Sequence, residues 1–286
     1  MRYSGKVSID LHSHSNVSDG TEPPEEVIRL ARVAGVKTLA LTDHDTVGGL
    51  AAAAAVLPPG MTLIPGMELS CRYLDRSVHL LAYLFDSSNE ELSAELRRIR
   101  ESRDIRAREM VDRLSSHGIP INWEIVSGIA GDGVVGRPHI ARAMVQIGAA
   151  SDVQEVFDLW ISPGTPGYVH RYALEPVRAV ELVRAAGGVA VIAHPARGDE
   201  GPQPVELVER MAAVGLGGIE VDHPMHDRTE REFWRGVAES LSIVATGSSD
   251  DHGSLTGHRL GCETTDPDAL EALIAGASGA VPLTGV

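Results

Sequence analysis

The chain has 286 residues, of which 43% are hydrophobic, and it carries a formal net charge of −15. This acidic balance argues against a broad nucleic-acid-binding surface, because such a surface needs a basic face to displace counterions. No apolar run approaches the ~20 residues of a membrane span, no signal segment opens the chain and two cysteines give no disulfide framework, so we expect a cytoplasmic globular protein without a membrane segment.

Residues 1–87 predict alternating strands and helices. Strands are expected at 7–11, 36–41, 61–65 and 77–85, and helices at 23–34 and 46–57. The apolar run at 36–41 is typical of a parallel strand that is covered on both faces. This alternation is typical of a barrel or a doubly wound sheet.

The pattern changes between residues 88 and 172. A long charged helical pattern covers 90–117, with seven arginines from Arg97 to Arg113, and further helices are expected at 138–147 and 152–160. No clear parallel strand follows until the run at 189–193. We interpret 88–172 as a helical insertion that caps the mouth of the sheet.

Strands and helices alternate again after residue 172. Helices are expected at 175–186, 204–214, 226–240 and 267–275, and strands at 189–193, 218–221 and 242–245. An α/β barrel of about 250 residues with one insertion accounts for this length. We therefore predict one barrel domain, formed by 1–87 together with 173–286.

Histidines and acids collect at the carboxyl ends of these strands. His12 and His14 lie two residues apart at the end of the first strand, so their side chains share one face and can hold a single ion. Later strand ends carry His44, Glu68, His194, Asp250 and His252. So many buried polar groups favour a metal site, because they are costly without a counter-ion. Imidazoles and carboxylates without thiolate suit Zn, Mn or Fe.

These residues form a series of motifs that resembles the PHP family, the polymerase and histidinol phosphatase phosphoesterases. The motifs in chain order are His12-x-His14, Asp19, Thr42-Asp43-His44-Asp45, Gly66-Met67-Glu68, His79, Ala193-His194-Pro195 and Ser249-Asp250-Asp251-His252. The resemblance spans residues 7–252 and implies a distorted (β/α)7-type barrel. The sequence is most similar to a branch of the family that acts on nucleoside 3',5'-bisphosphates and on the 5' ends of short RNA.

The resemblance implies three divalent ions (Mn, Zn or Fe) on nine ligands. One ion is expected on His12, His14, Glu68 and Asp250, a second on Glu68, His79 and His194, and a third on Asp19, His44 and His252. Asp19 has the alternative of a plain turn with Gly20. Asp43, Asp45 and Asp251 could orient imidazoles, although Asp45 is better placed to cap a helix.

Ions in such a cluster would hold a bridging hydroxide near neutral pH, and this hydroxide would attack phosphorus in line. We therefore expect phosphoester hydrolysis, with Glu68, Asp250 and His223 as catalytic residues. The resemblance implies that the substrate is the 3'-phosphate of nucleoside 3',5'-bisphosphates, with 5'-3' cleavage of short 5'-phosphorylated RNA as a further activity. His223, just past the strand at 218–221, is favoured over His226 as the general acid for the leaving oxygen. The alternative for His223 is a structural role.

We expect arginines to bind any substrate phosphate that the metals do not bind, because Lys6 and Lys37 are the only lysines. Arg137 and His139 open a predicted helix whose free N–H groups can help to bind an anion. The alternative is a surface arginine and a capping histidine. The other predicted substrate contacts are Arg171, Arg197 and His223.

Two other interpretations stay open. Histidinol phosphate phosphatases share the implied fold and ligand cluster, and metal-poor PHP modules without activity accompany polymerases. The arginine-bearing insertion favours a nucleotide substrate, and the complete ligand set favours an enzyme. The oligomeric state is not fixed by the sequence.

Overall fold

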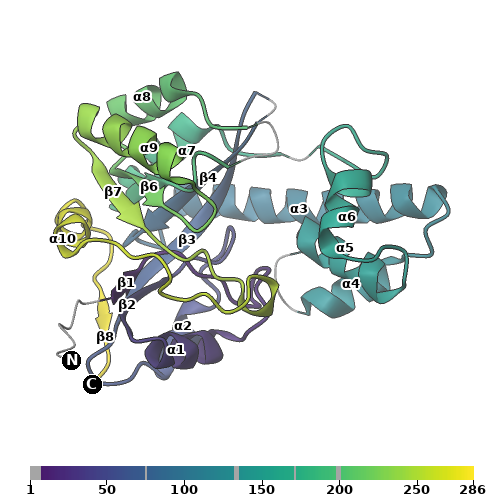
Figure 1. Cartoon of the computed structure of the whole chain (residues 1–286), viewed down its shortest axis with the longest axis horizontal. Coiled ribbons are helices and arrows are strands. Elements are labelled where there is room, and N and C mark those ends of the chain that lie inside the picture. Colours follow the sequence, from purple (N-terminus) through teal and green to yellow (C-terminus); the bar gives the residue numbers. More distant parts are fainter. Residues whose placement is uncertain (1–7, 75, 132–134, 171, 198–200) are drawn as a thin grey trace.

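The computed structural model describes residues 8–286, apart from 75, 132–134, 171 and 198–200. Strands within these ranges form one sheet: β1 (Ser8–Asp10), β2 (Val36–Leu41), β3 (Thr62–Tyr73), β4 (Arg76–Tyr83), β5 (Val189–Ile192), β6 (Gly218–Asp222), β7 (Val244–Gly247) and β8 (Leu283–Thr284). β1 to β7 follow one another across the sheet in chain order, and β8 pairs with β3 (Figure 1). The predicted α/β class is therefore confirmed.

Six of the first seven strands run in the same direction, and β4 runs in the opposite one. β4 runs antiparallel to both β3 and β5, whereas β1 to β3 are parallel to one another and so are β5 to β7. β3 extends well beyond the predicted 61–65, because apolar Met67, Leu69 and Cys71 alternate with polar Glu68 and Ser70 past the expected end, and all five are buried. Glu68 and His79 consequently lie inside strands, and the expectation that Glu68 follows a strand end is wrong.

The chain that follows β7 lies along the extension of β1. The N–H of Asp250 donates to the carbonyl of His12 at 2.9 Å, and the N–H of His14 donates to the carbonyl of Asp251 at 2.9 Å. Within the described residues β1 and β7 do not pair as strands, so closure of a (β/α)7 barrel stays a prediction. The two hydrogen bonds place the first and last predicted ligand motifs side by side.

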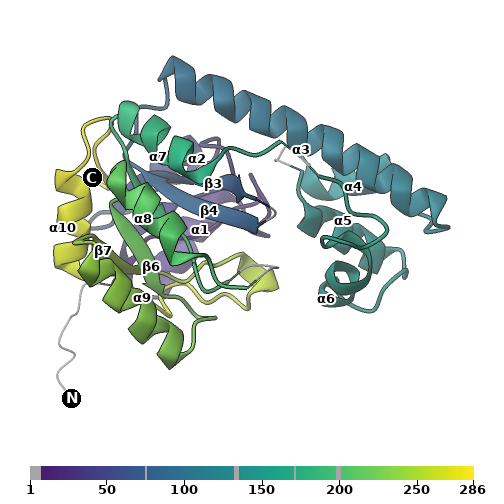
Figure 2. The same ribbon diagram turned by 90° about the horizontal axis from the view of Figure 1, so that it is seen from above.

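Helices on the outside of the sheet bury its apolar side chains (Figure 1, Figure 2). They are α1 (Pro24–Val33), α2 (Leu50–Ala55), α7 (Pro176–Ala185), α8 (Val205–Ala213), α9 (Arg228–Ser240) and α10 (Pro267–Ala275). α1 buries Val27, Ile28 and Ala31 at helical spacing, and α9 buries Trp234. All four residues of β5 are buried, as expected for a strand between two layers.

A second group of helices projects from one side of the sheet (Figure 2). This helical lobe comprises α3 (Glu90–Ser116), α4 (Trp123–Ala130), α5 (Arg137–Gln146), α6 (Val153–Val156) and the π-helical turn η1 (Phe157–Ile161). Its apolar side chains, which include Met110 and Ile140, form a cluster of their own. The sequence analysis missed α4, because its eight residues are too few for a clear periodic pattern.

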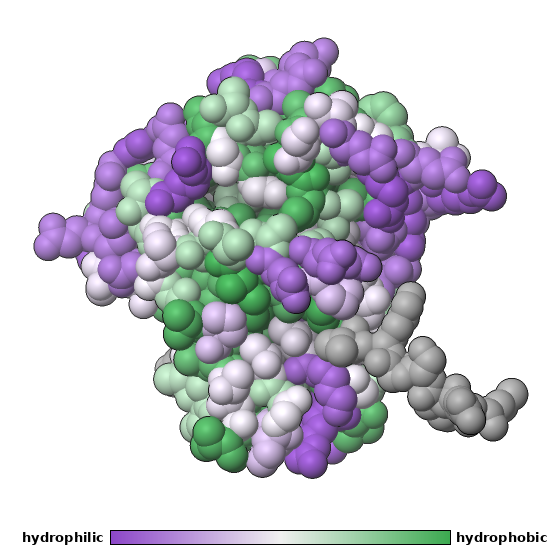
Figure 3. All heavy atoms as spheres, turned by 90° about the vertical axis from the view of Figure 1, so that its left-hand side faces the viewer, coloured by the Kyte–Doolittle hydropathy of each residue, from purple (hydrophilic) through white to green (hydrophobic). Residues whose placement is uncertain are grey.

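The face of the molecule that points away from the helical lobe carries both hydrophilic and hydrophobic side chains (Figure 3). None of the helices in the described ranges is both long enough and apolar enough to cross a bilayer.

α3 joins the lobe to the sheet. Its first half, including Leu92, packs with β3 and β4, and its second half packs inside the lobe. Between the two halves, Nε of Arg103 donates to Oδ2 of Asp45 at 2.6 Å, and its Nη2 donates to Ser70 Oγ. Asp45 also accepts the N–H of Ser70 at 2.7 Å. The helix cap expected at Asp45 is wrong, because Gly49 precedes α2 and Asp45 anchors the lobe instead.

We expect Asp45→Asn to lower the free energy of unfolding by about 3–5 kcal/mol, because it removes the carboxylate that pairs with a buried guanidinium. Asn preserves the side-chain size and tolerates the positive φ of 55° at this position. Urea unfolding measures the change. Asp104→Asn is the control, because Asp104 is exposed on the same helix and should change stability by less than about 0.5 kcal/mol. Equal losses in the two variants would contradict the anchor.

Candidate metal centre

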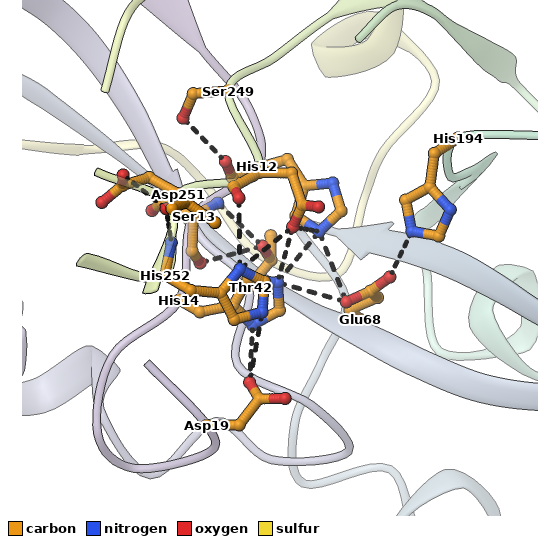
Figure 4. Close-up of polar contacts among 12 residues, drawn as sticks. His12, Ser13, His14, Asp19, Thr42, Glu68, His194, Ser249, Asp251 and His252 are labelled. Carbon is orange, nitrogen blue, oxygen red and sulfur yellow. Dashed lines mark hydrogen bonds and ion pairs between the residues drawn. The ribbon is translucent and has the colours of Figure 1, made fainter. Parts of the chain in front are cut away.

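The nine predicted ligands converge at one edge of the sheet, and Figure 4 shows most of them. His12, His14 and Asp19 follow β1, His44 follows β2, Glu68 and His79 lie in β3 and β4, His194 follows β5, and Asp250 and His252 follow β7. The carboxyl ends of parallel strands meet at one edge, which explains most of these positions. Glu68 reaches the same edge because its N–H donates to the carbonyl of Thr42, past the end of β2, at 3.0 Å.

The carboxylate of Glu68 lies at the middle of the cluster and is 1% exposed. Its Oε2 is within 3.3 Å of three imidazole nitrogens, those of His12, His14 and His44. Its Oε1 lies 2.7 Å from His79 Nδ1 and 3.1 Å from His194 Nε2. One carboxylate therefore connects histidines from four different strands or strand ends.

Two further carboxylates extend the cluster on either side of His14. Oδ1 of Asp250 lies 3.3 Å from His12 Nε2, 3.4 Å from His14 Nε2 and 3.5 Å from His252 Nδ1. Oδ1 of Asp19 lies 3.3 Å from His252 Nε2 and 3.7 Å from His14 Nδ1. Asp19 is thus part of the cluster and not merely a residue of a turn.

The ligand atoms form groups of the size that a metal ion requires. Three sets have ligand atoms within 4.8 Å of one another: His14, Asp19, His44 and His252; His12, His14 and Asp250; His44, Glu68 and His79. His14 also joins the set predicted around Asp19, and His194 belongs to none of the three although it contacts Glu68. Nδ1 of His44 is buried and makes no hydrogen bond, although Oε2 of Glu68 lies 3.2 Å away, so a cation bound to both atoms would satisfy them. These residues fit divalent metal ions.

Burial and charge act in opposite directions on these groups. Burial lowers the pKa of His14, but hydrogen bonds to Asp250 and Glu68 outweigh it and raise that pKa to about 10. Burial raises the pKa of Glu68, but the surrounding imidazoles outweigh it and hold that pKa well below its usual range. Burial lowers the pKa of His44 to about 3, so this imidazole stays neutral. Protons and cations therefore compete for the ligands.

Neighbouring carboxylates hold the loops that carry the ligands. Asp43 accepts hydrogen bonds from the N–H and hydroxyl of Ser15 at 2.8 and 2.7 Å. Asp251 accepts the N–H groups of Gly253 and Arg259 at 3.0 and 2.7 Å. The sequence predicts that both could orient imidazoles, and the structure shows them accepting hydrogen bonds from loop N–H and hydroxyl groups instead.

The sequence analysis missed two residues of the site. Glu220 of β6 is fully buried and contacts His12, and its signal was a lone carboxylate in the otherwise apolar run at 218–221. Nη2 of Arg259 donates to the carbonyl of Asp250 at 2.8 Å. Arg259 lies in a loop with no periodic pattern, so the sequence carried no signal for it.

A cavity of about 1010 Å³ lies beside the cluster. The ligands line one side, and the remaining walls include Arg137 and Phe157 of the lobe, Arg197, His223 and Arg259. A narrower recess of about 170 Å³ shares Arg137 with this cavity and adds three arginines: Arg72, Arg103 and Arg106. The cavity therefore sets guanidinium groups around the cluster, an arrangement that suits a phosphorylated ligand.

The structure brings Arg137, Arg197 and His223 of the predicted substrate contacts to this cavity. Nδ1 of His223 accepts the N–H of Met225 at 3.1 Å, so its proton is on Nε2. This Nε2 lies 3.2 Å from Oδ2 of Asp250.

Other predicted contacts lie elsewhere. His139 is buried against a different cavity, and its Nδ1 accepts the N–H of Gly136 at 3.0 Å, which is the capping alternative. His226 is buried with Nδ1 donating to the carbonyl of Val221 at 2.9 Å, and it does not line the cavity beside the cluster. Arg171 lies outside the described residues.

Comparisons with known proteins agree with this geometry. The family model of the PHP domain matches residues 10–117. The chain is 38% identical over 256 residues to a 3',5'-nucleoside bisphosphate phosphatase of Chromobacterium violaceum, and the aligned region covers 88% of this chain and 90% of that protein. It is 34% identical over 245 residues to a 5'-3' exoribonuclease of Haemophilus influenzae, with 85% of this chain and 89% of that protein covered. A solved structure from Bifidobacterium adolescentis, assigned as a metal-dependent phosphoesterase, superposes with a TM-score of 0.89 at 32% identity, covering 95% and 97%.

We expect divalent cations to bind more tightly as pH rises and to release protons on binding. His14, with a pKa raised to about 10, holds a proton at neutral pH that a cation must displace, so affinity should rise by up to about tenfold per pH unit for each proton displaced. Calorimetry of the metal-free protein with Mn²⁺, in buffers of different ionisation heat, counts the protons. An affinity that stays constant between about pH 6 and pH 9 would contradict this expectation.

Proposed function

This chain belongs to the PHP family of metal-dependent phosphoesterases, and we propose that it hydrolyses the 3'-phosphate of nucleoside 3',5'-bisphosphates. It is a phosphoric ester hydrolase, and the proposal concerns its substrate. The cavity beside the ligand cluster carries the proposal, because arginines from separate parts of the chain surround it. A substrate with two phosphates needs two such regions, one at the metals and one at the guanidinium groups.

We propose three divalent ions (Mn, Zn or Fe) for the cluster, with Glu68 shared between two of them. The ligand sets are His12, His14, Glu68 and Asp250; Glu68, His79 and His194; and Asp19, His44 and His252. The distances around Glu68 and Asp250 support this assignment. Bound ions would lower the pKa of a water molecule and neutralise charge on phosphate oxygens.

The second phosphate is assigned to Arg137 and Arg197, which line the cavity. Arg137 begins α5, and His139 accepts a backbone N–H at the start of this helix. We therefore assign His139 to fixing the helix that carries Arg137, in place of a phosphate contact. The insertion at 88–172, which contains the helical lobe, then acts as a cap on the domain formed by 1–87 and 173–286, because Arg137 and Phe157 of the lobe form part of the cavity wall.

His223 is proposed as the general acid that protonates the leaving 3'-oxygen. Its proton is held on Nε2, the nitrogen that faces Asp250 and the cluster, because Met225 N–H occupies Nδ1. The ring is 2% exposed, which shields this proton from bulk water.

The same site suits 5'-3' cleavage of short 5'-phosphorylated RNA, whose end also presents a terminal phosphate beside a phosphodiester. The net charge of −15 limits such a substrate to contacts within the cavity, since long RNA would need an extended basic face. Histidinol phosphate carries a single phosphate and would leave the arginines of the cavity without an anion.

Phosphate release from three substrates tests the proposal: adenosine 3',5'-bisphosphate, a 5'-phosphorylated oligoribonucleotide and histidinol phosphate. We expect turnover of the first, and of the second to a smaller extent, with loss on chelation and recovery on adding Mn²⁺. Turnover of histidinol phosphate alone would contradict the nucleotide substrate, and no metal-restorable turnover of any of them would favour a non-catalytic module.

We expect Arg137→Ala to raise KM for the bisphosphate by roughly 10–100-fold with a smaller change in kcat, because a charged hydrogen bond to a phosphate contributes about 1.5–3 kcal/mol. Arg142→Ala is the matched control, because Arg142 lies on the same helix but lines the other cavity. Steady-state kinetics of both variants measure the changes in KM and kcat. Unchanged kinetics in Arg137→Ala, or equal changes in both, would remove the phosphate-binding role of Arg137.

A further inference from the structure

Glu220 of β6 contacts two of the proposed metal ligands from behind. Its side chain is fully buried and does not line the cavity. Oε1 lies 3.0 Å from Nδ1 of His12, and Oε2 accepts the backbone N–H of His194 at 2.8 Å. Each carboxylate oxygen therefore faces one of the two residues.

The contact with Glu220 determines where His12 carries its proton. An ionised carboxylate only accepts hydrogen bonds, so the Nδ1 that faces it carries hydrogen. Nε2 of His12 points the other way, 3.3 Å from Glu68 Oε2 and 3.3 Å from Asp250 Oδ1. These two carboxylates are assigned to the same ion as His12, so a bound cation would replace hydrogen on Nε2 but not on Nδ1. A neutral imidazole protonated on Nδ1 keeps the lone pair of Nε2 directed at the cluster.

The second contact acts on the backbone of His194. This residue has a φ of 29°, which is unfavourable for any residue other than glycine and needs support from its surroundings. The hydrogen bond to Glu220 gives this support at the N–H. His194 then places Nε2 at 3.1 Å from Oε1 of Glu68.

We propose that Glu220 is a positioning residue of the metal centre, which fixes the proton of His12 on Nδ1 and holds the backbone of His194, so that both imidazoles present Nε2 to cations. Hydrogen-bond partners of this kind orient metal-bound histidines and raise their basicity. Here one carboxylate orients ligands assigned to two different ions. The inference rests on the ligand sets proposed above.

The substitution Glu220→Gln tests this arrangement with almost no change in shape. Glutamine offers one acceptor and one donor where the native carboxylate offers two acceptors. The backbone N–H of His194 cannot reverse its role, so the amide oxygen turns to it and the NH₂ group faces His12 Nδ1. His12 then carries its proton on Nε2, which removes the lone pair from the cluster.

Zinc affinity is the readout, measured by competition between metal-free protein and a chromogenic chelator. We expect Glu220→Gln to bind at least one ion about 10–100-fold more weakly than the wild type. Tyr83→Phe is the control, because this buried hydroxyl donates to the carbonyl of Leu11 at 2.7 Å without touching a ligand side chain, and it should bind zinc as the wild type does. Undiminished affinity in Glu220→Gln, or the same loss in both variants, overturns the proposal. A wild type that binds no zinc overturns the metal centre as well, so the two failures are distinguishable.

A measurement on the wild type does not depend on whether a variant folds. Nitrogen-proton NMR correlations of the histidine rings in the zinc-loaded protein, with His12 assigned by comparison with His12→Gln, show which nitrogen carries hydrogen. We expect a proton on Nδ1 and zinc on Nε2 of His12. Zinc on Nδ1 overturns the proposal.

Discussion

The carboxylate of Glu68 is buried where histidines from four strands or strand ends meet, and the fold must keep it compensated. Glu68 is 1% exposed, and a carboxylate buried to this extent is very costly unless other charges or cations surround it. Five imidazoles contact the two oxygens of this carboxylate. Those imidazoles come from residues 12 to 194, so the fold must bring distant strands to one edge. The parallel order of β1 to β3 and β5 to β7, with the hairpin of β3 and β4 between them, achieves this.

The cavity beside the ligand cluster, which is proposed to bind substrate, is held by the same frame. Arg137 comes from the helical lobe, and the buried pair of Arg103 and Asp45 fixes the lobe one residue after the ligand His44. Asp43, one residue before His44, accepts the N–H of Ser15 in the loop that carries His14 and Asp19. Buried carboxylates on both sides of His44 therefore hold the lobe and the first ligand loop, an arrangement that suits the proposed two-phosphate substrate.

Sequence patterns predicted most of the residues that the structure brings together, because His12 and His14 lie two residues apart just past a strand and because strand ends meet at one edge. The sequence-based prediction failed where a contact between residues far apart in the chain determines the role of a side chain. The local sequence predicts a helix cap at Asp45, but the partner of Asp45 is Arg103 of α3, which lies 58 residues later in the chain. The antiparallel turn of β3 into β4 depends on pairing that no local pattern reports. Glu220 was visible only as a carboxylate in an apolar strand, and Arg259 acts from a loop.

Divalent cations bound by the histidines and carboxylates around Glu68 would be visible in anomalous diffraction at the zinc edge, from crystals of the zinc-loaded protein. We expect anomalous peaks at about 2.0–2.2 Å from imidazole nitrogens and carboxylate oxygens of the cluster, with Glu68 between two of them. Peaks confined to exposed histidines such as His117, with none beside Glu68, would show that the cluster is not a metal centre.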